Sequence, residues 1–147
     1  MAAGPLSNDL AHAWLAANIP RRTRVFVSPL FVDDLADLPL DFVGLGPAGF
    51  QQYRLPEGKG PSAERSPIYY PALVDRLRRD RVEYLVLNSW FEDAFSPVPE
   101  NLRWFPRSVE SYRAFRERLD QAATLAWQVD GITAGRLGPA ISIYRLN

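Results

Sequence analysis

The chain contains no cysteine, and its 147 residues include a single histidine, His12, and a single lysine, Lys59. Without cysteine there is no disulfide, no thiolate metal ligand and no cysteine nucleophile. His12 has no second imidazole with which to share a metal ion, and it lies off the apolar stripe of its predicted helix. We therefore expect His12 to face solvent.

Net charge and long apolar runs are also lacking. Seventeen basic residues balance seventeen acidic ones, so no long-range field attracts nucleic acid or an anionic bilayer. No apolar run approaches the roughly 18 residues that span a membrane, and the N-terminus lacks the pattern of a signal peptide. We expect a chain that is itself soluble and binds no nucleic acid. Its first six residues are compatible with a natural N-terminus and equally with an engineered one, from which an upstream portion of the protein has been removed.

The composition is that of one globular domain spanning residues 1–147, with 47% hydrophobic and 23% charged residues. Apolar residues at helical spacing predict three helices, over 8–18, 67–79 and about 108–121. Runs rich in β-branched and aromatic residues predict strands over 24–28, 82–87, 124–129 and 140–146. This alternation predicts an α/β fold with a mostly parallel sheet of about four to five strands, and an antiparallel C-terminal hairpin formed by the last two.

Three details of these elements are specific enough to be tested. The apolar stripe of the first helix is expected to contain Leu10, Ala13, Trp14 and Ala17. The second helix should start at Ser66-Pro67, and the third should be capped by Ser108. The strand over 82–87 is almost continuously apolar, which predicts a central position with helices on both faces of the sheet.

Residues 29–67 form an irregular insertion rich in proline and glycine. Short extended pieces are predicted over 41–43 and 50–55, and residues 56–66 read as an exposed, mobile loop. The segment Gly44–Gly49 matches the GxGxxG pattern of dinucleotide sites, but no helix follows it to present N-terminal amides to a phosphate. A glycine-rich turn is therefore the prediction, and no cofactor is expected.

The acidic residues occur in two clusters, one made of Asp33, Asp34 and Asp37 and the other of Glu92 and Asp93. Either cluster could bind a hard cation or act as an acid/base pair, but neither has the ligand spacing of a calcium loop. Helix N-terminal turns favour carboxylates. We expect helix-capping roles and no metal site.

The best candidate for ligand binding follows the central strand. Asn88, Ser89 and Trp90 lie just beyond it, where open α/β sheets bind ligands, and they supply amide, hydroxyl and aromatic surface. Asn and Ser at such a turn are also common for capping alone. The charged face of the helix over 67–79 is expected to be solvated, with contact to an anion or a lipid headgroup as the alternative, and it contains Asp75, Arg76, Arg78 and Arg79.

Three segments together carry a family resemblance, namely "AHAWLAANIP" before "RVFV", then "DRLRRDRVEYLVLNSWFEDAF", then "GPAISIYRL". In content and order they resemble the C-terminal soluble region of bacterial polytopic membrane glycosyltransferases, the group related to protein O-mannosyltransferases and aminoarabinose transferases. The resemblance covers the two ends and the middle of the chain but not Pro29 to Pro67. Its motifs are structural rather than chemical.

The resemblance implies a domain that follows the last transmembrane helix and faces the periplasm or the cell exterior. The family's catalytic carboxylates would lie in membrane-proximal loops outside this chain, which would be non-catalytic. It would support acceptor binding or the membrane portion of a transferase that uses a polyprenyl-phosphate-sugar donor. The aromatic residues expected at that contact, which are equally candidates for the core, are Trp90, Phe91, Trp104 and Phe105.

Two rival functions come from other classes. One is a free-standing module that binds a small polar ligand at the turn formed by Asn88, Ser89 and Trp90. The other is a small enzyme that uses Glu92 or Asp93 as a general base. Specific ligand binding by the isolated domain would favour the first, and activity lost on Glu92→Ala or Asp93→Ala would favour the second.

Overall fold

Five strands form one sheet in the computed structural model, which describes residues 7–28, 35, 37–44, 53, 69–130 and 140–147. The strands lie in the order β2-β1-β3-β5-β4. Their bounds are β1 Arg24–Val27, β2 Asp41–Val43, β3 Tyr84–Asn88, β4 Ala123–Val129 and β5 Ile141–Leu146. The predicted α/β class, the central strand and the C-terminal hairpin are confirmed.

Strand β5 alone runs against the others. β1 pairs in parallel with both β2 and β3, whereas β5 is antiparallel to β3 on one side and to β4 on the other. Since β4 is antiparallel to β5, it runs in the same direction as the first three strands. Within the hairpin, β5 therefore lies between β3 and β4, and β4 forms an edge of the sheet.

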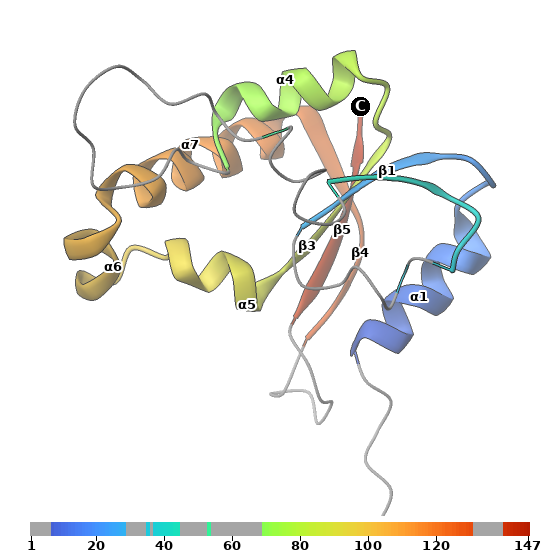
Figure 1. The fold of residues 1–147 in the computed structure, drawn as a ribbon, viewed down its shortest axis with the longest axis horizontal. Coiled ribbons are helices and arrows are strands. Elements are labelled where there is room, and N and C mark those ends of the chain that lie inside the picture. The colour runs from blue at the N-terminus through green and yellow to red at the C-terminus, as the bar shows by residue number, and fades with distance from the viewer. Residues whose placement is uncertain (1–6, 29–34, 36, 45–52, 54–68, 131–139) are drawn as a thin grey trace, which may run out of the picture.

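Helices cover both faces of the sheet. α1 (Ser7–Asn18) lies on one side, and α4 (Pro71–Arg79) and α7 (Pro106–Ala122) pack together on the other (Figure 1). Successive residues of β3 point to opposite faces. Leu85 and Leu87 join the core under α4 and α7, while Val86 joins the core under α1. This double burial explains why β3 is almost continuously apolar.

The first helix buries a different stripe from the predicted one. Ala11, Leu15 and Ile19 are buried, whereas Ala13 and Ala17 are exposed. Alanine offers little apolar surface, so the larger Leu15 and Ile19 side chains determine which face packs on the sheet, and Ala11 lies on that face. Trp14 borders that face and stacks on Trp127 of β4, with ring centroids 6.1 Å apart.

Both later helices begin elsewhere than predicted. α4 starts at Pro71, four residues late, because the buried Tyr69 and Tyr70 precede it in non-helical backbone; Ser66 and Pro67 lie outside the described residues. α7 starts at Pro106, and Ser108 is buried within its first turn instead of capping it. In each case a proline occupies the first turn, where its missing N–H costs no hydrogen bond.

Between β3 and α7 the chain forms three short helical pieces. They are α5 (Ser89–Glu92), the 3-10 turn η1 (Asp93–Phe95) and α6 (Pro99–Trp104). The sequence patterns did not predict α6, which has no buried residue and lies away from the sheet (Figure 1). Proline at its start and at the start of α7 breaks the segment into short helices.

Within the predicted insertion, β2 confirms the extended piece over 41–43, and most of the piece over 50–55 lies outside the described residues. Gly44 follows β2 with a φ of 81°. Tyr53 is buried against Phe26, with ring centroids 5.8 Å apart, and its hydroxyl donates to Asp80 over 2.9 Å. Burial, with the Asp80 carboxylate, raises the pKa of Tyr53 to about 12.

None of the helices in the described ranges is both long enough and apolar enough to cross a lipid bilayer.

Candidate functional site

The carboxyl edge of the sheet contains the point at which the strand order reverses. From β1 the chain passes to β2 on one side and then to β3 on the other. Open α/β sheets bind ligands outside the carboxyl ends of strands at such a point. Ser28 follows β1 there, and Asn88 ends β3 beside it.

Asn88 and Ser28 are joined within the core. The Asn88 Nδ2 atom donates to Ser28 Oγ over 2.7 Å, and both residues are completely buried. The Ser28 amide also donates to the Val86 carbonyl over 2.9 Å. Burying an amide and a hydroxyl is tolerable because they satisfy one another. This pair fixes the carboxyl ends of β1 and β3 side by side.

Ser89 is held by the start of β5. Its amide donates to the Ala140 carbonyl, and the Ala140 amide donates to Ser89 Oγ, each over 2.9 Å. Of the three predicted ligand-binding residues, Asn88 and Ser89 thus make hydrogen bonds within the fold. The side chain of Trp90 lies outside the described part of the structure.

Tyr69 brings a third polar group to the same edge. Its ring is fully buried and packs against Phe115 at 5.0 Å between centroids. Burial, followed by the negative charge of Glu92, raises the pKa of the Tyr69 phenol well above its usual value, while a hydrogen bond with Ser28 opposes this rise. The phenol therefore remains neutral and acts as a donor or acceptor only.

Glu92 is the acidic member of this group. The Tyr112 hydroxyl donates to Glu92 Oε2 from the facing helix α7. Burial raises the pKa of Glu92, and the hydrogen bond from Tyr112 and the positive charge of Arg116 oppose that rise. Burial and the Glu92 charge in turn raise the pKa of Tyr112. A half-buried carboxyl beside a phenol can exchange a proton with a bound molecule, which is the chemistry of general acid/base groups.

The two predicted acidic clusters take different roles. Glu92 ends α5 and is partly buried, whereas Asp93 is exposed and its carbonyl accepts from Ser96 Oγ over 2.9 Å. Asp37 lies 2.9 Å from His12 Nε2, so the expectation of a histidine that only faces solvent was incomplete. Asp33 and Asp34 are outside the described residues. Within the described ranges no three metal-ligating side chains come together.

Sequence reasoning missed three members of the carboxyl-edge group, which are Ser28, Tyr69 and Tyr112. Each comes from a different part of the chain, and they are separated from Asn88 and Glu92 by 19 to 64 positions along the sequence. The parallel pairing of β1 with β3 places Ser28 beside Asn88, and the contact of α7 with η1 brings Tyr112 to Glu92. The strand pairing, had it been known, would have indicated Ser28 but neither Tyr69 nor Tyr112.

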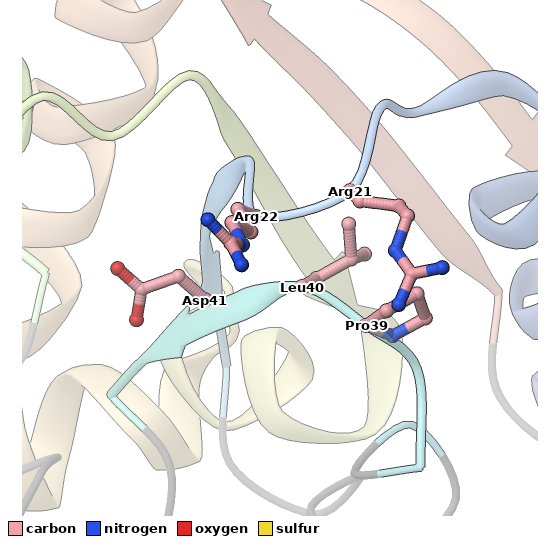
Figure 2. Close-up of a pocket in the computed structure, with 5 residues that line it drawn as sticks. All are labelled: Arg21, Arg22, Pro39, Leu40 and Asp41. Atoms are coloured by element: carbon pink, nitrogen blue, oxygen red, sulfur yellow. The ribbon is translucent and has the colours of Figure 1, made fainter.

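A pocket of about 390 Å³ opens at the opposite, amino-terminal edge of the sheet (Figure 2). It lies between the turn that precedes β1 and the start of β2. Figure 2 shows the two arginine side chains on opposite sides of Leu40. Its lining residues are Arg21, Arg22, Pro39, Leu40 and Asp41.

A second hollow of about 390 Å³ lies beside the C-terminal residues of β5. Arg145 is its single charged side chain, and Thr124 Oγ1 there donates to Asn147 Oδ1 over 3.1 Å. The first pocket therefore has the greater concentration of positive charge.

Large apolar side chains are exposed around α6. Trp104 is 60% exposed, and three neighbours are close to half exposed, namely Val98, Leu102 and Phe105. Val98 and Phe105 flank α6 as its N-cap and C-cap residues, and Leu102 and Trp104 lie within it. The Arg103 guanidinium lies over the Trp104 ring at 5.1 Å from its centroid. We call these four apolar residues the α6 patch.

The fold and these sites define an α/β domain with one five-stranded mixed sheet, a polar group at its carboxyl edge and an apolar surface patch. Comparison of the chain with family models, with curated proteins and with solved structures found no match. Function is therefore argued from the residues of this chain.

Proposed function

We propose that the chain is a non-catalytic accessory domain of a bacterial membrane glycosyltransferase, on the periplasmic or extracellular face of the membrane. It supports acceptor binding or the membrane portion of an enzyme that takes its sugar from a polyprenyl-phosphate donor. The proposal rests on the three resembling segments, and one structural observation carries it further. That observation is the α6 patch.

Trp104 and Phe105 were candidates for either a contact surface or the core. Their exposure, with that of Val98 and Leu102, favours the contact surface. Contiguous apolar patches on soluble domains are commonly sites of protein or membrane contact. Trp beside Arg suits the boundary between membrane and water, since its ring is apolar and its N–H is polar. The occupant we propose is the transferase's own membrane portion, at the level of the lipid headgroups.

Fractionation of the source cells tests this proposal. Membrane and soluble fractions are immunoblotted with an antibody raised against residues 69–130. A membrane-bound band several times larger than 16.6 kDa is expected. A soluble band at the size of this chain would overturn the proposal.

A second function, binding of a small polar ligand by a free-standing module, is favoured by the carboxyl-edge group. Ser28 and Asn88 are bonded to one another where the strand order reverses, and the negative charge of Glu92 acts on Tyr69 beside them. A screen of small polar metabolites by thermal shift tests it, with Glu92→Gln as the matched variant. Stabilisation that disappears in Glu92→Gln would support this function, and stabilisation by none of the compounds would count against it.

A further inference from the structure

The pocket at the amino-terminal edge is lined by two arginine side chains, those of Arg21 and Arg22. Among the described residues, neither Arg21 nor Arg22 has a side-chain ion pair or hydrogen bond. The one carboxylate of the pocket, on Asp41, accepts instead from Arg24 Nε over 2.8 Å. The pocket thus has an excess of positive charge in a chain whose net charge is zero.

The backbone holds Arg22 in place. Its φ is 67°, in the left-handed region that residues with a Cβ rarely adopt. Its amide donates to the Pro39 carbonyl over 2.8 Å, and the next residue, Thr23, donates through its hydroxyl to the Pro20 carbonyl over 2.7 Å. These bonds fix the turn before β1, so the pocket wall is formed before any ligand arrives. Strained backbone of this kind is common at binding sites.

We propose that this pocket binds a phosphate group. The guanidinium is a planar fork that matches phosphate oxygens, and Arg21 and Arg22 supply one from each side of Leu40. Leu40 and Pro39 offer apolar surface to whatever the phosphate is attached to. A volume of about 390 Å³ accommodates a phosphate with a small attached group. The ligand is therefore a phosphate ester, either a soluble one or a lipid headgroup. The inference stands independently of the proposed function.

Arg81 supplies a matched control. Among the residues that the structure describes, it is the other non-glycine residue with a positive φ, at 63°. It lies three residues before Tyr84, and Arg22 lies three residues before Val25, the residue of β1 with which Tyr84 pairs. Arg81 is exposed and does not line the pocket. Replacing either arginine by glycine removes one positive charge and relieves the same backbone strain, so both variants should fold.

The test is an NMR titration of the whole chain with inorganic phosphate at constant ionic strength. We expect saturable shifts at the amides of Arg21, Arg22 and Leu40, with a dissociation constant on the order of 1 mM. Arg22→Gly should weaken binding about tenfold, as expected for loss of one charge-assisted contact. Arg81→Gly should leave the affinity within about twofold. Equal losses in both variants, or no saturation, would overturn the proposal.

Co-sedimentation with vesicles distinguishes the two sources of phosphate. Phosphatidylcholine vesicles with and without phosphatidylglycerol are mixed with the protein and with both variants. Binding to the anionic vesicles that Arg22→Gly removes and Arg81→Gly retains would assign the pocket to a lipid headgroup. Phosphate binding without vesicle binding would assign it to a soluble phosphate ester. Vesicle binding that both variants reduce equally would show diffuse electrostatic attraction, and it would contradict phosphate binding at the pocket.

Discussion

The Tyr112 hydroxyl donates a hydrogen bond to Glu92 Oε2, and this bond joins the middle of α7 to the last residue of α5. Tyr112 also lies against Tyr69 and Phe95, with ring centroids 5.5 Å and 6.0 Å away. The carboxylate is therefore held at the rim of an aromatic cluster. The stability of this region and the pKa of Glu92 therefore both depend on the hydrogen bond from Tyr112.

Tyr112→Phe should lower the free energy of unfolding by about 2 kcal/mol at neutral pH, because it removes a hydrogen bond to a charged group. The bond opposes the burial that raises the pKa of Glu92, so its loss should raise that pKa further. The destabilisation should therefore shrink as the pH falls and Glu92 takes up a proton. Urea unfolding of the parent protein and of Tyr112→Phe over a pH series measures this destabilisation.

Glu92→Gln is the control for the pH dependence. Because the folded pKa of Glu92 is raised above its ordinary value of 4.5, stability from this group is complete below about pH 4.5 and is lost as the pH rises through the folded value. Asp75 contributes with the opposite sign, because Arg118 lowers its pKa and that stability is lost as the pH falls. The quantity to compare is therefore the difference in the free energy of unfolding between Glu92→Gln and the parent protein at each pH. A destabilisation by Tyr112→Phe that does not change with pH would contradict ionisation of Glu92.

Asn88→Ala should lower the free energy of unfolding by about 2 to 3 kcal/mol, because it leaves a cavity and removes a donor from the buried Ser28 hydroxyl. Ser28→Ala should cost about 1 kcal/mol. The double variant should be less destabilised than the sum, by about 1 kcal/mol, since both changes remove the same bond. Denaturant unfolding of the four proteins gives the coupling, and strict additivity would show that the bond contributes nothing.

The sheet was largely predictable because the strands carry their own signal. Val25 to Val27 and Leu85 to Leu87 are apolar at every position, and burial on both faces of a sheet requires this. The helix starts were harder to predict. Several prolines are compatible with a first helical position, and the choice of Pro71 over Pro67 depends on Tyr69 and Tyr70 being buried before the helix begins.

The candidate sites depend on tertiary contacts, so the sequence indicated only parts of them. Asn88 was identified from its place after the central strand and Glu92 from the acidic cluster that it forms with Asp93, but their partners Ser28 and Tyr112 lie far away along the chain. The Arg22 pocket was not predicted, because no local pattern indicates that a residue with a Cβ adopts a positive φ. The exposure of Trp104 could not be decided either, since aromatic residues at helical spacing are more often core.

Gly44→Ala should destabilise the fold by about 2 kcal/mol. Gly44 has a φ of 81°, and an added Cβ would lie 2.9 Å from Phe26 Cε2, inside the core under α4. The cost combines left-handed backbone with overpacking. Arg22→Gly is the opposite change, from a side chain to glycine at a positive φ, and it should leave stability unchanged or raise it by up to about 1 kcal/mol. Thermal unfolding compares the two, and an unaffected Gly44→Ala would show that β2 and β1 can separate without cost.

Leu102→Gln and Trp104→Gln should each change the free energy of unfolding by less than about 0.5 kcal/mol, because both side chains are about half exposed or more and α6 buries no residue. Phe115→Ala is the buried control, and it should cost about 3 to 5 kcal/mol. Urea unfolding measures all three variants. A loss of more than about 1 kcal/mol in either glutamine variant would mean that the α6 patch packs within the fold. The patch would then have no surface to offer the membrane portion, and the proposed accessory function would lose its structural support.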